Sequence, residues 1–260
     1  MAVGLVCLML PALGCRSFQS KLSSQRLEHG YTIVLPGILG EQGWDRNVAD
    51  TIRNSSYPGE VEIYDWTHGP LLFGWNMFDS RQVKQISSRI TNYQERYPGR
   101  PVYLIGHSGG CKIAVQTLES MPTGRRIEKA VLLAPGMSSH YDLRQAMSHT
   151  RSGISAFSSA LDVPISVPLT GFRGLADGEL RLPAAAFGFH PPKGLSTEEA
   201  RRYEQLLDQR RYSGQMLGTG HLGGHFGWTS PSFIAEHVVP QILSPSQQAP
   251  HHTASGAKGL

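Results

Sequence analysis

The stretch "YLIGHSGGCKIA", residues 103–114, decides the fold. Residues typical of a buried strand lead into Ser108, which has one glycine two positions before it and two directly after it, and an apolar helical pattern follows. The spacing is Gly-x-Ser-x-Gly, in which glycines allow close approach of a strand and a helix around a serine on a sharp turn. The stretch therefore predicts a strand–turn–helix unit. Ser108 is either a nucleophile presented by that turn or part of a turn that only needs small residues.

Apolar runs and helical patterns alternate on both sides of this stretch. The runs at 31–35, 61–66, 102–106 and 129–134 are typical of strands, and 154–158 and 212–217 are weaker candidates. Three helices are expected. One contains Val83, Ile86, Ile90 and Tyr93, whose spacing places them on one face, and a second covers 196–211, where Ser196 and Glu199 have the spacing of a capping box. The third begins after Ser230-Pro231. This alternation predicts an α/β fold with a mostly parallel sheet covered on both faces.

Composition limits the function classes. The chain has 260 residues, of which 40% are hydrophobic, and a formal net charge of +4. This length suits one α/β domain. The basic residues are scattered, without a basic stripe interleaved with aromatics, which argues against a nucleic-acid partner. Neither a dinucleotide fingerprint nor a metal-ligand spacing is present, so no cofactor is predicted.

A serine nucleophile needs a base and an acid that orients the base. In folds with this serine turn, the chain order is serine, acid, histidine. The loop "GTGHLGGHFGWTSPSFI", residues 218–234, offers two histidines. His225 is the favoured base because it lies shortly before the last helix. His221 is the alternative, or else a loop residue or an accessory donor.

The acid should follow the strand that precedes the histidine loop. Asp162 comes soon after the strand pattern at 154–158 and is the favoured acid. Asp177 is the alternative, farther into a loop, whereas Asp142 is more typical of a residue that caps or pairs on a short helix. Gly37 permits a sharp turn after the run at 31–35.

That turn aims the Ile38 N–H at the serine, so Ile38 and Gly109 are the expected oxyanion donors. The residues thus predict a hydrolase that forms an acyl-enzyme.

Residues 30–243 also resemble the α/β-hydrolase superfamily, and within it a branch of bacterial secreted or lipoprotein hydrolases. The resemblance rests on "LPGILG" (35–40), "YDWT" (64–67), "GHSGG" (106–110), "LLAPGMSSHYDL" (132–143), "FSSALD" (157–162) and "GGHFGWTS" (223–230). It implies Ser108 as nucleophile, Asp162 as acid, His225 as base and Ile38 as oxyanion donor.

Two apolar insertions, 66–80 and 163–192, are expected either to line the substrate pocket above Ser108 or to pack as surface loops. An apolar lining favours a small-molecule ester or lipid-like substrate. An acyltransferase or an amidase would use the same three side chains. The alternative from a different class is a non-catalytic binding protein on the same scaffold.

The two ends of the chain differ from the middle. Residues 1–15 are apolar, uncharged and too short to span a bilayer, and they end in "ALGC", which resembles a lipoprotein cleavage box with Cys15 as the lipidated residue. The expected organisation is a leader (1–15), a polar tether (16–29), the hydrolase domain (30–243) and a disordered tail (244–260). This predicts an exported lipoprotein anchored at a membrane. The alternative is a plain signal peptide and a soluble secreted or periplasmic protein. Cys111 would be a buried, inert packer.

Overall fold

The computed structural model describes residues 22–67, 80–163 and 182–243 of the chain. Six strands form one sheet in the order β2-β1-β3-β4-β5-β6, and every neighbouring pair is parallel. The strands are β1 (Tyr31–Leu35), β2 (Glu60–Ile63), β3 (Val102–His107), β4 (Lys129–Leu133), β5 (Ile154–Ser158) and β6 (Leu207–Arg211). The predicted α/β architecture with a parallel sheet is confirmed.

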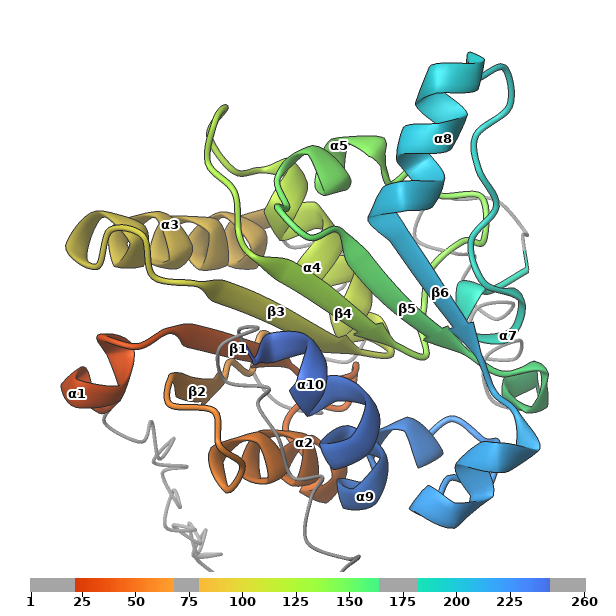
Figure 1. Ribbon diagram of the computed structural model, residues 1–260, viewed down its shortest axis with the longest axis horizontal. Coiled ribbons are helices and arrows are strands. Elements are labelled where there is room, and N and C mark those ends of the chain that lie inside the picture. The colour runs from red at the N-terminus through yellow and green to blue at the C-terminus, as the bar shows by residue number, and fades with distance from the viewer. Residues whose placement is uncertain (1–21, 68–79, 164–181, 244–260) are drawn as a thin grey trace, which may run out of the picture.

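Helices cover both faces of this sheet (Figure 1). One face carries α3 (Ser80–Arg96), α4 (Gly109–Glu119), α5 (Arg144–Ser148) and α8 (Thr197–Leu206), and the other carries α2 (Gly43–Arg53), α9 (Pro231–Phe233) and α10 (Val239–Ile242). The short helices are α1 (Ser24–Leu27), α7 (Ala184–Phe187), the 3-10 turns η3 (Ala160–Asp162), η4 (Gly214–Thr219) and η5 (Gly227–Thr229), and the π-helical turn η6 (Ile234–Val238).

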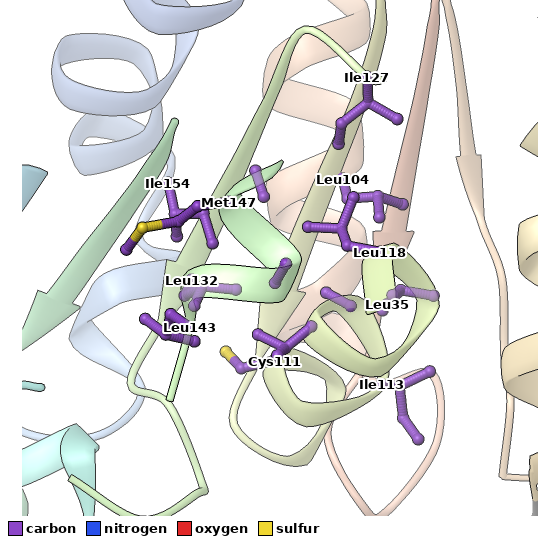
Figure 2. Close-up of a cluster of buried hydrophobic side chains, with 14 of the residues drawn as sticks. Leu35, Leu104, Cys111, Ile113, Leu118, Ile127, Leu132, Leu143, Met147 and Ile154 are labelled. Carbon is purple, nitrogen blue, oxygen red and sulfur yellow. The ribbon is translucent and has the colours of Figure 1, made fainter. Parts of the chain in front are cut away.

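The strands alternate their side chains between two apolar cores. Leu104 and Leu132 point to the face of α3 and α4, where they join Cys111 and Leu118 (Figure 2). Ile105 faces the opposite way and joins the core formed with α2, α9 and α10. Because a strand sends successive side chains to opposite faces, an unbroken apolar run is what a doubly covered strand requires.

The predicted strand at 212–217 is wrong, and the last strand comes earlier. The helix predicted over 196–211 begins as expected, since Glu199 N–H donates to Ser196 Oγ at 3.3 Å and Ser196 N–H donates to the Glu199 carboxylate at 2.9 Å. It ends at Leu206, and the remaining residues form β6. Among the described strands, this edge strand pairs with β5 alone. Its exposed side chains are polar and alternate with less exposed ones, so it lacks the apolar run that predicts a strand.

Local contacts also shorten β2 relative to the predicted 61–66. It ends at Ile63 because Asp65 accepts hydrogen bonds from Thr67 N–H at 2.9 Å and from Glu41 N–H at 3.1 Å, which turns the chain. The last helix starts at Pro231 as predicted, but Ser230 Oγ donates to Thr219 O at 2.6 Å instead of capping the helix.

The expected tether at 16–29 is shorter than predicted at its carboxyl end. Residues 24–27 form α1, and Arg26 Nε donates to Gly59 O at 2.9 Å. Tyr93 OH donates to Leu27 O at 2.7 Å, so these residues belong to the domain. The expected leader, Cys15 and the tail at 244–260 lie outside the described residues. Across 22–67, 80–163 and 182–243, no helix combines the length and apolarity needed to cross a membrane.

Candidate active site

Ser108 lies on a strained turn between β3 and α4. Its backbone has φ 53° and ψ −118°, values that a residue with a Cβ rarely adopts. Ser108 N–H donates to Leu133 O at 2.9 Å, and Gly136 N–H donates to Ser108 O at 3.0 Å, so the turn is held from β4. A Cβ added to Gly110 would lie 2.2 Å from Leu35 O, and one added to Gly106 would lie 2.6 Å from Cys111 Cα. The glycines are therefore required by the contact of α4 with two strands.

Asp162 and His225 come together at the carboxyl edge of the sheet. Asp162 ends the turn that follows β5, and His225 lies in the loop between η4 and η5. His225 Nδ1 is 2.8 Å from Asp162 Oδ2 and 2.9 Å from Oδ1, and both residues are buried. A carboxylate held at Nδ1 fixes the orientation of the ring and leaves Nε2 as the nitrogen that can take a proton.

His221 is placed differently. Its Nδ1 accepts a hydrogen bond from Gly223 N–H at 2.8 Å, and its ring lies edge-on to Trp228 with centroids 4.0 Å apart. Burial lowers the pKa of His221 from 6.5 to about 4. His221 is therefore a neutral ring packed among aromatic side chains. This arrangement agrees with the alternative that His221 is a loop residue. The other alternate, Asp177, lies outside the described residues.

The two expected oxyanion donors lie against each other beside the serine turn. A Cβ on Gly109 would lie 3.5 Å from Ile38 N and 2.5 Å from Ile38 Cγ2, and one on Gly37 would lie 3.5 Å from Ser108 Cβ. Within the described segments, neither the Ile38 nor the Gly109 N–H has a hydrogen-bond acceptor. Both donors are thus available to a negatively charged oxygen next to Ser108.

Two titratable side chains that the sequence analysis did not single out border this site. His107 directly precedes Ser108, and its ring centroid is 5.2 Å from that of His225. Asp45, in the first turn of α2, places Oδ1 3.4 Å from His107 Nδ1. The only sequence signal for His107 is its place inside the Gly-x-Ser-x-Gly motif.

Cys111 has no part in this polar cluster. Its side chain is fully buried, Sγ lies 3.1 Å from Gly106 O, and burial raises the pKa of the thiol. The prediction that Cys111 is buried is confirmed, and a buried thiol with a raised pKa is expected to be unreactive. In the parts of the chain that the structure describes, no group of three or more His, Cys, Asp and Glu side chains is arranged to hold a metal ion.

The fold has counterparts among solved structures. No family model and no curated protein matches the chain. An esterase from Pyrococcus furiosus superposes with a TM-score of 0.50 at 10% identity, over 82% of this chain and 82% of that one. Aspergillus fumigatus lipase B superposes with a TM-score of 0.50 at 11% identity, over 81% of this chain and 51% of that one. Together with the parallel sheet, this likeness shows that the chain has the α/β-hydrolase fold.

Proposed function

We propose that this protein is a serine hydrolase that cleaves an ester through an acyl-enzyme. The observation that carries the proposal is the buried Asp162–His225 hydrogen bond beside the strained Ser108 turn. A carboxylate, an imidazole and a hydroxyl in this chain order are the parts that such a reaction needs. The proposal names Ser108 as nucleophile, His225 as base and Asp162 as the acid that orients it.

The proposed reaction has two halves. Ser108 Oγ attacks the ester carbonyl carbon while its proton passes to His225 Nε2, and the oxyanion is stabilised by the Ile38 and Gly109 N–H groups. The tetrahedral intermediate collapses, and the leaving alcohol takes the proton from His225. Water then attacks the acyl-enzyme with His225 again as base, which releases the carboxylic acid and restores Ser108.

An apolar acyl group fits the surroundings. Three exposed, large apolar side chains are adjacent in sequence to proposed catalytic or oxyanion residues. They are Leu39 after Ile38, Leu161 before Asp162 and Phe226 after His225. Leu222, also exposed, lies in the His225 loop, where a Cβ on Gly223 would lie 2.4 Å from Leu161 Cδ1. Apolar side chains predominate in the lining of small-molecule sites. This favours an ester with an apolar acyl chain.

A fluorophosphonate probe tests the proposal. The wild type is expected to be labelled and to hydrolyse p-nitrophenyl esters, with higher kcat/KM on longer acyl chains than on acetate. Ser108→Ala should abolish both labelling and turnover because the attacking oxygen is gone. Ser88→Ala, on the exposed side of α3, is the matched control and should behave as the wild type. Labelling retained in Ser108→Ala would refute the nucleophile, and an unlabelled wild type would favour a non-catalytic binding protein.

An acyltransferase or an amidase would use the same residues. Product analysis with an added alcohol acceptor, and turnover of a matched anilide, distinguish these reactions from ester hydrolysis.

A further inference from the structure

A second acid and imidazole lie on the α2 side of the proposed base. The alternation of β3 sends Tyr103 and Ile105 to the core shared with α2. His107 has the same parity, and its Nδ1 lies 3.4 Å from Asp45 Oδ1 of α2. The side chain of Asp45 is 0% exposed and that of His107 is 2% exposed. These two titratable groups therefore face each other inside the molecule.

This pair is costly to bury and has few other partners. Asp45 Oδ2 accepts a hydrogen bond from Gln42 N–H at 3.0 Å. Within the described segments, no hydrogen-bond partner is found for Asp45 Oδ1 or for either ring nitrogen of His107. The polar contact recorded for these atoms is the one between Asp45 Oδ1 and His107 Nδ1. A buried carboxylate that is incompletely paired destabilises a fold, and an apolar pair of similar size is often as stable. Such local conflicts are expected at functional sites.

The pair reaches the proposed base through the ring of His107. Asp162 holds His225 at Nδ1, whereas the ring of His107 lies against the ring of His225 with centroids 5.2 Å apart and planes inclined by 45°. Phe226 joins the same group, since its ring centroid is 6.1 Å from that of His107 and 4.7 Å from that of Trp44. The start of α2, the end of β3 and the loop of the base are thus packed together.

We propose that Asp45 and His107 form a second buried acid–imidazole pair that positions His225 and keeps a second negative charge near it. The proposal rests on the proposed hydrolase function. With a neutral ring on His107, the pair carries one negative charge, that of the Asp45 carboxylate 3.4 Å from His107 Nδ1. When His225 takes the proton of Ser108 it becomes positive, and this nearby charge attracts it.

Among the described residues, three charged or titratable groups besides the pair bear on the proposed site. Asp162 faces His225 from η3, and His107 faces it from β3. Asp45 faces His107 from α2. His221 belongs to the same loop as His225, but burial lowers its pKa to about 4, so it is neutral at neutral pH and adds no charge.

Asp45→Asn is the decisive variant because it removes the charge while retaining an oxygen that accepts from Gln42 N–H. The His225 ring is followed by NMR titration of ¹⁵N-labelled histidine, with His225→Gln to identify its signal. Its titration midpoint should move to lower pH in Asp45→Asn, and the acidic limb of kcat/KM should move with it. The kcat should fall on the order of 10-fold with little change in KM, as for other groups that orient a reacting side chain. Asp50→Asn, on the exposed side of the same helix, is the control and should leave both readouts unchanged.

His107→Gln is the second variant, and it decides the matter if Asp45→Asn does not fold. Its amide keeps a polar group near Asp45, but the ring that packs against His225 is lost, so kcat should fall while the thermal midpoint changes little. Folded variants in which the His225 titration and kcat match the wild type would overturn the proposal. The NMR titration does not need turnover. An inactive wild type would therefore refute the hydrolase function, whereas an unchanged His225 titration in Asp45→Asn would overturn the role of the pair.

Discussion

At the scale of single residues, four buried titratable side chains gather at the carboxyl edge of the sheet. The four are Asp162, His225, His107 and Asp45, and all are buried. Asp162 contacts His225, His225 contacts His107, and His107 contacts Asp45. Glu62 is also buried, but it is paired, because it accepts from Tyr31 OH and from Arg89 Nη1. Since each buried polar group costs free energy unless it is paired, this concentration is more readily explained by chemistry than by stability.

The proposed acid can be tested by an isosteric change. Asp162→Asn should leave the backbone in place but lose the carboxylate that holds His225 Nδ1. The kcat for an ester is then expected to fall by about 10⁴-fold, the loss seen when a triad aspartate becomes asparagine. Asp177→Asn should have a milder effect. A larger loss from Asp177→Asn than from Asp162→Asn would make Asp177 the acid.

His221 predicts a specific pH dependence of stability. Its pKa is lowered from 6.5 to about 4 in the folded protein. Above pH 6.5 the ring is neutral in both states, whereas between pH 6.5 and 4 the unfolded chain binds a proton that the folded one does not. Folding stability should therefore fall with decreasing pH across this window, by on the order of 3 kcal/mol in total.

Denaturant unfolding measured at several pH values tests this dependence. His221→Asn should have a lower stability at pH 7 because it leaves a cavity, but a smaller loss between pH 6.5 and 4. Its side-chain oxygen can still accept from Gly223 N–H. His29→Asn, at an exposed position, should keep the wild-type slope. Equal slopes in all three proteins would mean that His221 is not held neutral.

At the scale of elements, the close contact of α4 with β1 fixes the serine turn. A Cβ on Gly110 would meet the backbone oxygens of Leu35 and Pro36 at 2.2 and 2.5 Å, and backbone cannot rotate away as a side chain can. Gly110→Ala is therefore expected to lower stability by several kcal/mol, as overpacking of a core does. The thermal midpoint measures the change.

Gly43→Ala is the matched control for Gly110→Ala. Gly43 begins α2, and nothing lies within 4 Å of a Cβ added there. Because alanine favours helix more than glycine does, this variant should be as stable as the wild type or more stable. A Gly110→Ala protein with the wild-type midpoint would show that α4 can shift away from β1.

Elements with strong apolar patterns could be predicted, and those shaped by tertiary contacts could not. The strand over residues 154–158 agrees with β5 because its side chains are buried on both faces. β6 was missed because an edge strand tolerates polar side chains such as Asp208 and Gln209. The π-helical turn before Pro240 was also unpredicted, although Pro240 lacks the N–H that a regular helix would use there.

At the scale of the whole molecule, chain order carried more information than local pattern. Asp162 and His225 are far apart in sequence. The order serine, acid, histidine, with the place of Asp162 after a strand and of His225 before the last helix, favoured them over Asp177 and His221, and the structure brings Asp162 and His225 together. The pairing of Asp45 with His107 could not be read in this way. It depends on how α2 packs against β3, which no motif in either segment encodes.

The location of the whole molecule depends on its first residues, and here we propose a lipid anchor at Cys15. The support is the sequence "ALGC" after an apolar, uncharged stretch and the net charge of +4, which suits a surface of anionic headgroups. Stable anchoring needs more than one acyl chain, as a fully processed lipoprotein cysteine carries. Full-length protein from a lipoprotein-processing host should partition into the detergent phase. Cys15→Ser should remain unprocessed or become soluble, whereas Cys111→Ser should partition as the wild type does. A soluble wild type whose mature N-terminus is not Cys15 would replace the anchor with a plain export signal.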